Sequence, residues 1–123
     1  MPDSVIDRAG VNDLIYWALY FATSVYGHVA LKVAVRGAPE HSTLGVLRSG
    51  TSAWGLTAYL AWGVSCACWM LVLARSTLLR ANSVSSLGYV FISACAILFL
   101  GEAITWSRAV GAGLIALGIL LIR

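Results

Sequence analysis

The sequence predicts an all-α integral membrane protein, a single domain (residues 1–123) of four transmembrane helices. Composition carries the first part of this prediction, because 60% of the 123 residues are hydrophobic, only 11% are charged, and the mean hydropathy is +0.88. A soluble domain of this length could not bury so much apolar surface. Patterning carries the second part, since the apolar residues fall into long runs and a helix needs about 20 of them to cross a bilayer.

The first predicted span covers residues 14–35 and ends before Arg36. The preceding residues 1–13 carry three aspartates and lack the basic start and the cleavage site of a signal peptide. We therefore expect the first span to stay in the protein. Trp17 near its start is typical of a membrane interface.

A polar stripe runs along the second half of this span. Its members are four residues apart and so share one helix face: Tyr20, Ser24, His28 and Lys32. Ionisable residues within a span usually face a bundle interior or a water-filled cavity rather than lipid. We expect the stripe to meet a polar partner inside the protein.

The second predicted span, residues 54–74, contains Trp62 and Trp69 but no charged residue. The tryptophans either pack against lipid and helices or line a pocket. The link before this span, residues 36–52, has an apolar centre that would suit a short interfacial helix, although the sequence does not require one.

The third predicted span, residues 83–100, carries a second polar stripe from its leading edge. Its members follow at spacings of four, three and four residues, again on one helix face: Asn82, Ser86, Tyr89 and Ser93. One hydroxyl can be satisfied by a carbonyl one turn back. Four aligned polar groups favour a cavity or a neighbouring polar helix, and we expect this stripe to be the counterpart of the first.

The fourth predicted span, residues 106–122, is rich in small residues at helical spacing. Small residues let helix backbones approach closely, which drives helix association in lipid. The predicted interface residues are Ala109, Gly111, Gly113, Ala116 and Gly118. The interface would lie within the chain or with another copy.

Four spans divide the basic residues equally between the two membrane faces. Arg8, Arg75, Arg80 and Arg123 fall on one side, and Lys32, Arg36, Arg48 and Arg108 fall on the other. This tie selects no orientation and permits dual topology in an antiparallel dimer. It also places Lys32 and Glu102 at the same face.

The residue inventory favours transport over catalysis. We expect no enzyme, metal site or cofactor, because the sequence contains neither a nucleophile paired with a base nor a cluster of metal ligands. The three cysteines suit packing, and the scattered basic residues do not suggest nucleic-acid binding. Export of cations by proton exchange requires a carboxylate within the membrane. The intramembrane charge is instead Lys32, which suits an anionic group.

Three of these residues also have purely structural interpretations. Lys32 near a helix end would extend to the headgroups, and His28 would be a neutral side chain bonded to a carbonyl or hydroxyl. Glu102 would simply start the fourth helix, where acids favour the dipole. Alternatively, Glu102 pairs with Lys32 across a cavity mouth and is able to bind an amine.

Four segments resemble the four-helix members of the drug/metabolite transporter superfamily: SVYGHVALK (residues 24–32), SLGYVFI (86–92), FLGEAIT (99–105) and GLIALGILLI (113–122). In the small multidrug resistance exporters an essential glutamate stands where this chain has Ser24. The combination of Ser24, Gly27 and Lys32 is similar instead to the subunits of the undecaprenyl-phosphate-aminoarabinose flippase, although His28 replaces an amide.

This resemblance implies a small-multidrug-resistance-like fold and a homodimer or heterodimer with a related four-helix subunit, packed partly through the fourth helix. It also implies translocation of a polyprenyl-phosphate-linked amino sugar across the bacterial inner membrane for lipid A modification. The headgroup site would comprise Ser24, His28, Lys32, Ser86, Tyr89, Ser93 and Glu102. Two alternatives remain: a proton-coupled exporter of small cations with its coupling acid relocated to Glu102, and a non-transporting partner subunit.

Overall fold

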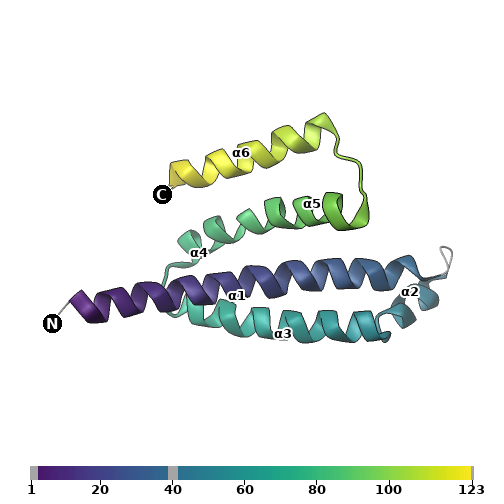
Figure 1. The fold of residues 1–123 in the computed structure, drawn as a ribbon, viewed down its shortest axis with the longest axis horizontal. Coiled ribbons are helices and arrows are strands. Elements are labelled where there is room, and N and C mark those ends of the chain that lie inside the picture. The colour runs from purple at the N-terminus through teal and green to yellow at the C-terminus, as the bar shows by residue number, and fades with distance from the viewer. Residues whose placement is uncertain (1–2, 39–41, 123) are drawn as a thin grey trace.

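Every element in the described part of the chain is a helix, as expected for an all-α protein (Figure 1). The structure is a computed structural model that describes residues 3–38 and 42–122, with side chains described for residues 10–38 and 42–121. Arg123 therefore lies outside the described residues, and so does the side chain of Arg8. The helices are α1 (Asp3–Arg36), α2 (Thr43–Ser49), α3 (Ala53–Leu73), α4 (Leu78–Ser85), α5 (Leu87–Leu100) and α6 (Trp106–Ile122).

Three helical segments are long and apolar enough to cross a membrane: Gly10–Arg36, Ala53–Leu73 and Leu78–Leu100. The shorter apolar helix Trp106–Leu121 lies where the sequence predicts a fourth span. These lengths and compositions are those of a multi-pass membrane protein. Helix α1 has 34 residues and is therefore about 51 Å long, which exceeds the roughly 30 Å of a hydrocarbon core. Its polar first turns extend the helix beyond the apolar run.

The link between α1 and α3 forms the short helix α2, which the sequence permits without requiring. Ser42 caps its start, and the Ser42 hydroxyl accepts a hydrogen bond of 3.1 Å from the Gly45 backbone N–H. Ser52 caps α3 in the same manner, accepting from Gly55 at 3.3 Å. These caps satisfy backbone donors that a helix start leaves free.

Helices α1 and α3 lie side by side along most of their length (Figure 1). The buried residues of both are mainly small, and they recur at steps of three, four or seven residues. On α1 they are Gly27, Ala30 and Ala34, and on α3 they are Gly55, Ala58, Ser65, Cys68 and Val72. Small side chains allow the close backbone approach that replaces the hydrophobic effect between helices in lipid. This pair is the packed core of the chain.

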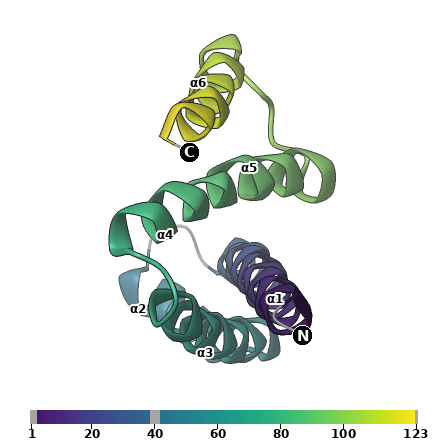
Figure 2. The same ribbon diagram turned by 90° about the vertical axis from the view of Figure 1, so that its left-hand side faces the viewer.

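Helix α5 crosses the other side of α1, where the contact is aromatic and apolar. The rings of Phe21 and Phe91 lie 5.4 Å apart at 62°. A cavity of about 480 Å³ beside them is lined only by apolar residues and Tyr26: Phe21, Ala22, Val25, Tyr26, Val29, Phe91, Cys95 and Phe99. Helix α6 lies beyond α5, away from α1 and α3 (Figure 2).

The segment that contains α4 and α5 is interrupted at Ser86. Serine hydroxyls before the interruption donate to carbonyls three or four residues back, Ser83 to Leu79 and Ser85 to Asn82. Such side-chain bonds compete with the backbone hydrogen bonds of the helix and can bend it. The helix begins at Leu78, five residues before the predicted third span, because helical turns continue past the apolar run into the polar link.

Candidate functional site

Lys32 and Glu102 meet at the end of the bundle where α1 and α5 both terminate. The Lys32 Nζ lies 3.7 Å from the Glu102 Oε1, with the two side chains 52% and 38% exposed. The sequence placed both residues at one membrane face and left their pairing as an alternative, and the structure contains the pair. Both side chains remain partly exposed, so the pair is accessible from outside the chain.

One hydrogen bond and one glycine conformation hold the chain in this arrangement. Arg36 Nη2 donates a 2.8 Å hydrogen bond to the carbonyl of Leu100, which is one of the carbonyls that a helix end leaves free. Gly101 then adopts a left-handed conformation with φ of 65°. Glycine takes this conformation at little cost. The resulting turn ends α5 immediately before Glu102.

The polar stripe of α1 faces α3 except for Lys32, which pairs with Glu102. Tyr20, Ser24 and His28 line a shallow pocket of about 270 Å³ together with residues of α3: Trp62, Ser65, Cys66 and Trp69. The Ser65 hydroxyl donates to the Tyr20 carbonyl at 3.4 Å. The pocket thus combines aromatic rings with hydroxyl groups and one imidazole.

A hydrogen bond holds His28 at the edge of this pocket. Its Nδ1 lies 2.7 Å from the Ser24 carbonyl oxygen. A carbonyl only accepts, so Nδ1 carries a hydrogen in this contact. The ring also meets Trp62 edge-on, with centroids 5.2 Å apart. The interpretation of His28 as a side chain bonded to a carbonyl agrees with this geometry.

The polar stripe of α5 lies elsewhere. Tyr89 and Ser93 line a pocket of about 260 Å³ between α5 and α6, which also includes Glu102 and Arg108. Ser86 stands at the helix interruption, and its hydroxyl donates to the Ser83 carbonyl at 2.6 Å. The chain therefore does not bring the two stripes face to face, contrary to the sequence-based expectation. The apolar contact around Phe21 and Phe91 occupies the α1–α5 interface instead.

Glu102 is the residue that connects the two regions, since it pairs with Lys32 and lines the α5–α6 pocket. Arg108 is a pocket residue that the sequence interpretation used only for topology. Its spacing of six residues from Glu102, across a link and a helix start, gives no helical periodicity that would have associated the two.

The glycines that the sequence assigns to an interface on α6 have open space beside them. A Cβ placed on Gly111, Gly113 or Gly118 would meet no atom of the described chain within 4 Å, apart from the helix's own backbone and adjacent residues. Trp106 and Leu121 on the same helix are 84% and 81% exposed. Only Ala112 of the small residues lines the pocket with α5.

Two curated relatives are similar to part of the chain. The protein of Sodalis glossinidius (strain morsitans) is 41% identical over 70 residues, which is 55% of this chain and 52% of the relative. The protein of Erwinia tasmaniensis is 42% identical over 65 residues, 51% of each. Both are named probable 4-amino-4-deoxy-L-arabinose-phosphoundecaprenol flippase subunit ArnF. The chain spans about half the length of these relatives.

No protein-family profile matches the chain, and no solved structure matches it. The names of both relatives nevertheless agree with the branch of the superfamily that the motifs around Ser24 and Lys32 indicate, which differs from the small multidrug resistance exporters. The resemblance predicted from the sequence is confirmed: the chain is similar, over about half its length, to subunits of the aminoarabinose-phosphoundecaprenol flippase.

Proposed function

We propose that this chain is a subunit of a transporter in the bacterial inner membrane that translocates a polyprenyl-phosphate-linked amino sugar, rather than an enzyme. Its four helices, α1, α3, α4–α5 and α6, would each cross the membrane in a single domain, as in the small multidrug resistance proteins. The product would supply an amino sugar for the modification of lipid A. The names of the two curated relatives support this class of cargo.

The observation that carries the proposal is the half-exposed ion pair of Lys32 and Glu102. A phosphate-linked amino sugar presents one anion and one cation at its headgroup. Lys32 would bind the phosphate, and Glu102 would bind the amine. Each side chain would thus exchange its protein partner for a ligand group that carries the same charge as that partner. An exchange of this kind loses little electrostatic energy, because exposed ion pairs contribute only about 0–1 kcal/mol.

The sugar would extend from this pair toward one of the two adjacent polar pockets. Ser24 and His28 with Trp62 and Trp69 offer aromatic faces and hydrogen-bonding groups on one side. Tyr89 and Ser93 offer hydroxyls on the other. The polyprenyl tail would follow the apolar surface between α1 and α5, where Val25, Phe91 and neighbouring side chains line a cavity of about 480 Å³.

A second four-helix subunit would complete the site. The small residues of α6 that have open space beside them would pack against it, either in a homodimer or in a heterodimer with a related protein. Such a partner would lie beside the α5–α6 pocket that Tyr89, Ser93 and Glu102 line, because α6 lies away from α1 and α3.

The proposal is tested by measuring lipid binding and translocation in proteoliposomes with a polyprenyl phosphate that carries an amino sugar. Lys32→Ala is expected to reduce binding on the order of tenfold, since a charged hydrogen bond contributes about 1.5–3 kcal/mol. Lys32→Arg should retain most of it. Arg48→Ala removes one positive charge from α2 and serves as the matched control.

Unchanged binding and translocation in Lys32→Ala would refute the site. Proton-driven uptake of a small cation that Glu102→Gln abolishes would instead indicate an exporter. The position of Glu102 at the end of α5, in contact with Lys32, argues against that alternative, which needs an acid within the span.

A further inference from the structure

A further polar cavity lies at the opposite end of the bundle from Lys32, where α1 begins its apolar run and α3 ends. Its volume is about 560 Å³, and its lining comes from α1, the end of α3, the link and α4. The lining residues are Gly10, Asp13, Leu14, Trp17, Val72, Arg75, Ser76, Arg80 and Val84. None of the residues predicted to bind substrate belongs to this cavity.

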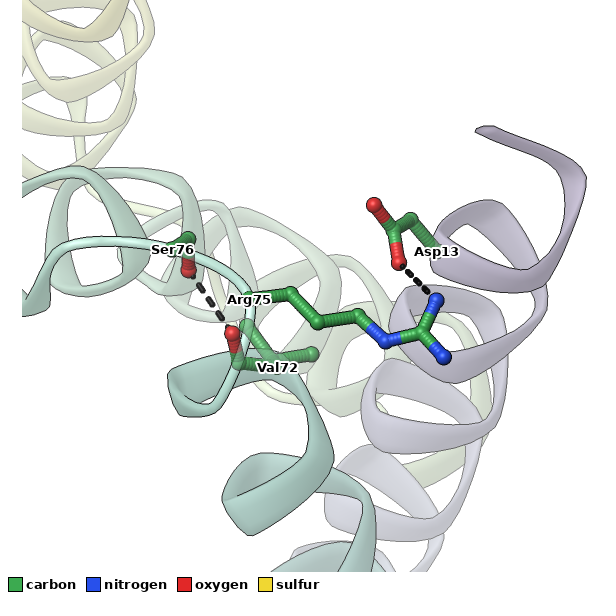
Figure 3. A network of polar contacts seen from close by, with 4 residues as sticks. All are labelled: Asp13, Val72, Arg75 and Ser76. Carbon is green, nitrogen blue, oxygen red and sulfur yellow. Dashed lines mark hydrogen bonds and ion pairs between the residues drawn. The ribbon is translucent and has the colours of Figure 1, made fainter. Parts of the chain in front are cut away.

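Arg75 reaches across this cavity from the link to α1 (Figure 3). Its Nη1 donates to the Asp13 Oδ1 at 3.0 Å, and its guanidinium lies 5.2 Å from the centre of the Tyr16 ring. Ser76 beside it donates its hydroxyl to the Val72 carbonyl at 2.9 Å, which ends the helix in a defined turn (Figure 3). Arg75 is thus held in position by one carboxylate and one aromatic face.

Among the side chains that the structure describes, the lining of the cavity contains two cations and one acid: Arg75, Arg80 and Asp13. No ion pair of Arg80 occurs among the residues whose side chains the structure describes. The side chains of Asp13 and Arg75 are 46% and 41% exposed, so an incoming anion can reach the guanidinium without unfolding the helices.

The position of the cavity indicates the source of such an anion. Leu14 starts the apolar run of α1, and Trp17 is the type of residue that lies at the headgroup level. Arginine forks match phosphate oxygens in geometry and charge. At this depth, phosphate groups belong mainly to lipids.

We propose that this cavity binds the phosphate of an anionic lipid, with Arg80 and Arg75 as its ligands. Asp13 holds Arg75 in place when the site is empty and is displaced from the guanidinium when phosphate binds. This second site does not depend on the proposed transport, because a lipid can bind here without being carried across the membrane.

The test is native mass spectrometry of the full chain in detergent, titrated with dihexanoyl phosphatidic acid or, for comparison, dihexanoyl phosphatidylcholine. Phosphatidic acid is expected to bind more tightly. Arg80→Gln should weaken its binding on the order of tenfold, the effect of losing one charged hydrogen bond. Arg48→Gln, an equal change of charge on α2 at the other end of the bundle, should leave binding unchanged.

The variant Asp13→Asn distinguishes a binding site from a purely structural ion pair. It replaces the carboxylate beside Arg75 by a neutral amide and so removes the one acid among the described lining residues, and phosphatidic acid should bind several-fold more tightly. Thermal unfolding of both variants in detergent shows whether each still folds. Weaker binding by a folded Asp13→Asn variant, or wild-type binding by Arg80→Gln, would overturn the proposal.

Inorganic phosphate added as a competitor identifies the source of the anion. Displacement of phosphatidic acid at millimolar concentration supports a site that recognises phosphate alone, and no displacement supports a site that also requires the lipid. Equal binding of phosphatidic acid and phosphatidylcholine contradicts the proposal. These probes carry neither a polyprenyl chain nor a sugar, so their failure would leave the proposed transport at Lys32 untouched.

Discussion

Trp62 packs its indole directly against Gly27, where a Cβ would collide with the ring nitrogen and its neighbouring carbon. The Trp62 Nε1 is buried there and has no hydrogen-bond partner in the described part of the chain. Close approach of α1 and α3 thus depends on the absence of a side chain at one position. The same packing leaves the Trp62 Nε1–H without a hydrogen-bond partner among the described residues, which costs free energy.

Gly27→Ala is expected to destabilise the protein by about 1–3 kcal/mol, because overpacking forces the indole or the helices to move. Thermal unfolding in detergent measures this effect. Gly63→Ala on α3 is the matched control, since its Cβ would meet open space. The control should be neutral or slightly stabilising, as alanine favours helix over glycine. A Gly27→Ala variant as stable as the control would contradict the packing described.

Trp62→Phe should be close to neutral alone, because the lost apolar area is offset by removal of a buried unsatisfied donor that costs about 1–3 kcal/mol. The smaller ring also leaves room at residue 27. A double-mutant cycle should therefore show that Trp62→Phe reduces the cost of Gly27→Ala by about 0.5–3 kcal/mol. Additive effects of the two substitutions would mean that they do not share this contact.

Glu102→Gln should change ligand preference rather than abolish binding. Removing the carboxylate leaves the Lys32 ammonium without its partner, so polyprenyl phosphate that lacks a sugar should bind up to about fivefold more tightly. Polyprenyl phosphate that carries an amino sugar should show a smaller gain in affinity, or a loss of affinity, because its amine no longer has the Glu102 carboxylate as a partner. Native mass spectrometry with both lipids measures the ratio. An equal fall for both would contradict the assigned roles.

Gly113→Leu should weaken subunit association while leaving the single chain intact. The added side chain meets open space within the chain, so any defect would arise at a partner surface. The ratio of monomer to dimer in native mass spectra, or energy transfer between labelled copies in liposomes, measures the effect. Gly63→Leu places the same side chain in open space on α3 and should leave the ratio unchanged.

The helices themselves were largely predictable, because apolar runs of suitable length mark the segments that lie in lipid. Their ends were less so. Helix α1 begins at Asp3, and α4 begins at Leu78, since polar residues continue a helix beyond the membrane wherever no residue breaks it. Periodicity reveals the apolar run and carries no information on these outer turns.

The polar stripes illustrate a different limit. Four-residue spacing places Ser24 and His28 on one face of α1, but it does not say which helix covers that face. Gly27 and Ala30 decide this, because the side of α1 with the smallest residues admits α3 most closely. The phenylalanines at 21 and 91 then meet on the side left for α5. The spacing of residues along one helix therefore cannot predict which neighbouring helix covers its polar face.

Helix α1 carries an acid at one membrane boundary and a base at the other. Asp13 and Lys32 are 19 positions apart in the sequence, about 28 Å along the helix, which is close to the thickness of a hydrocarbon core. Each is clamped to a different part of the chain, Asp13 to Arg75 and Lys32 to Glu102. Each of these exposed pairs contributes only about 0–1 kcal/mol. A ligand can therefore open either pair while the packing of α1 against α3 keeps the helix in place.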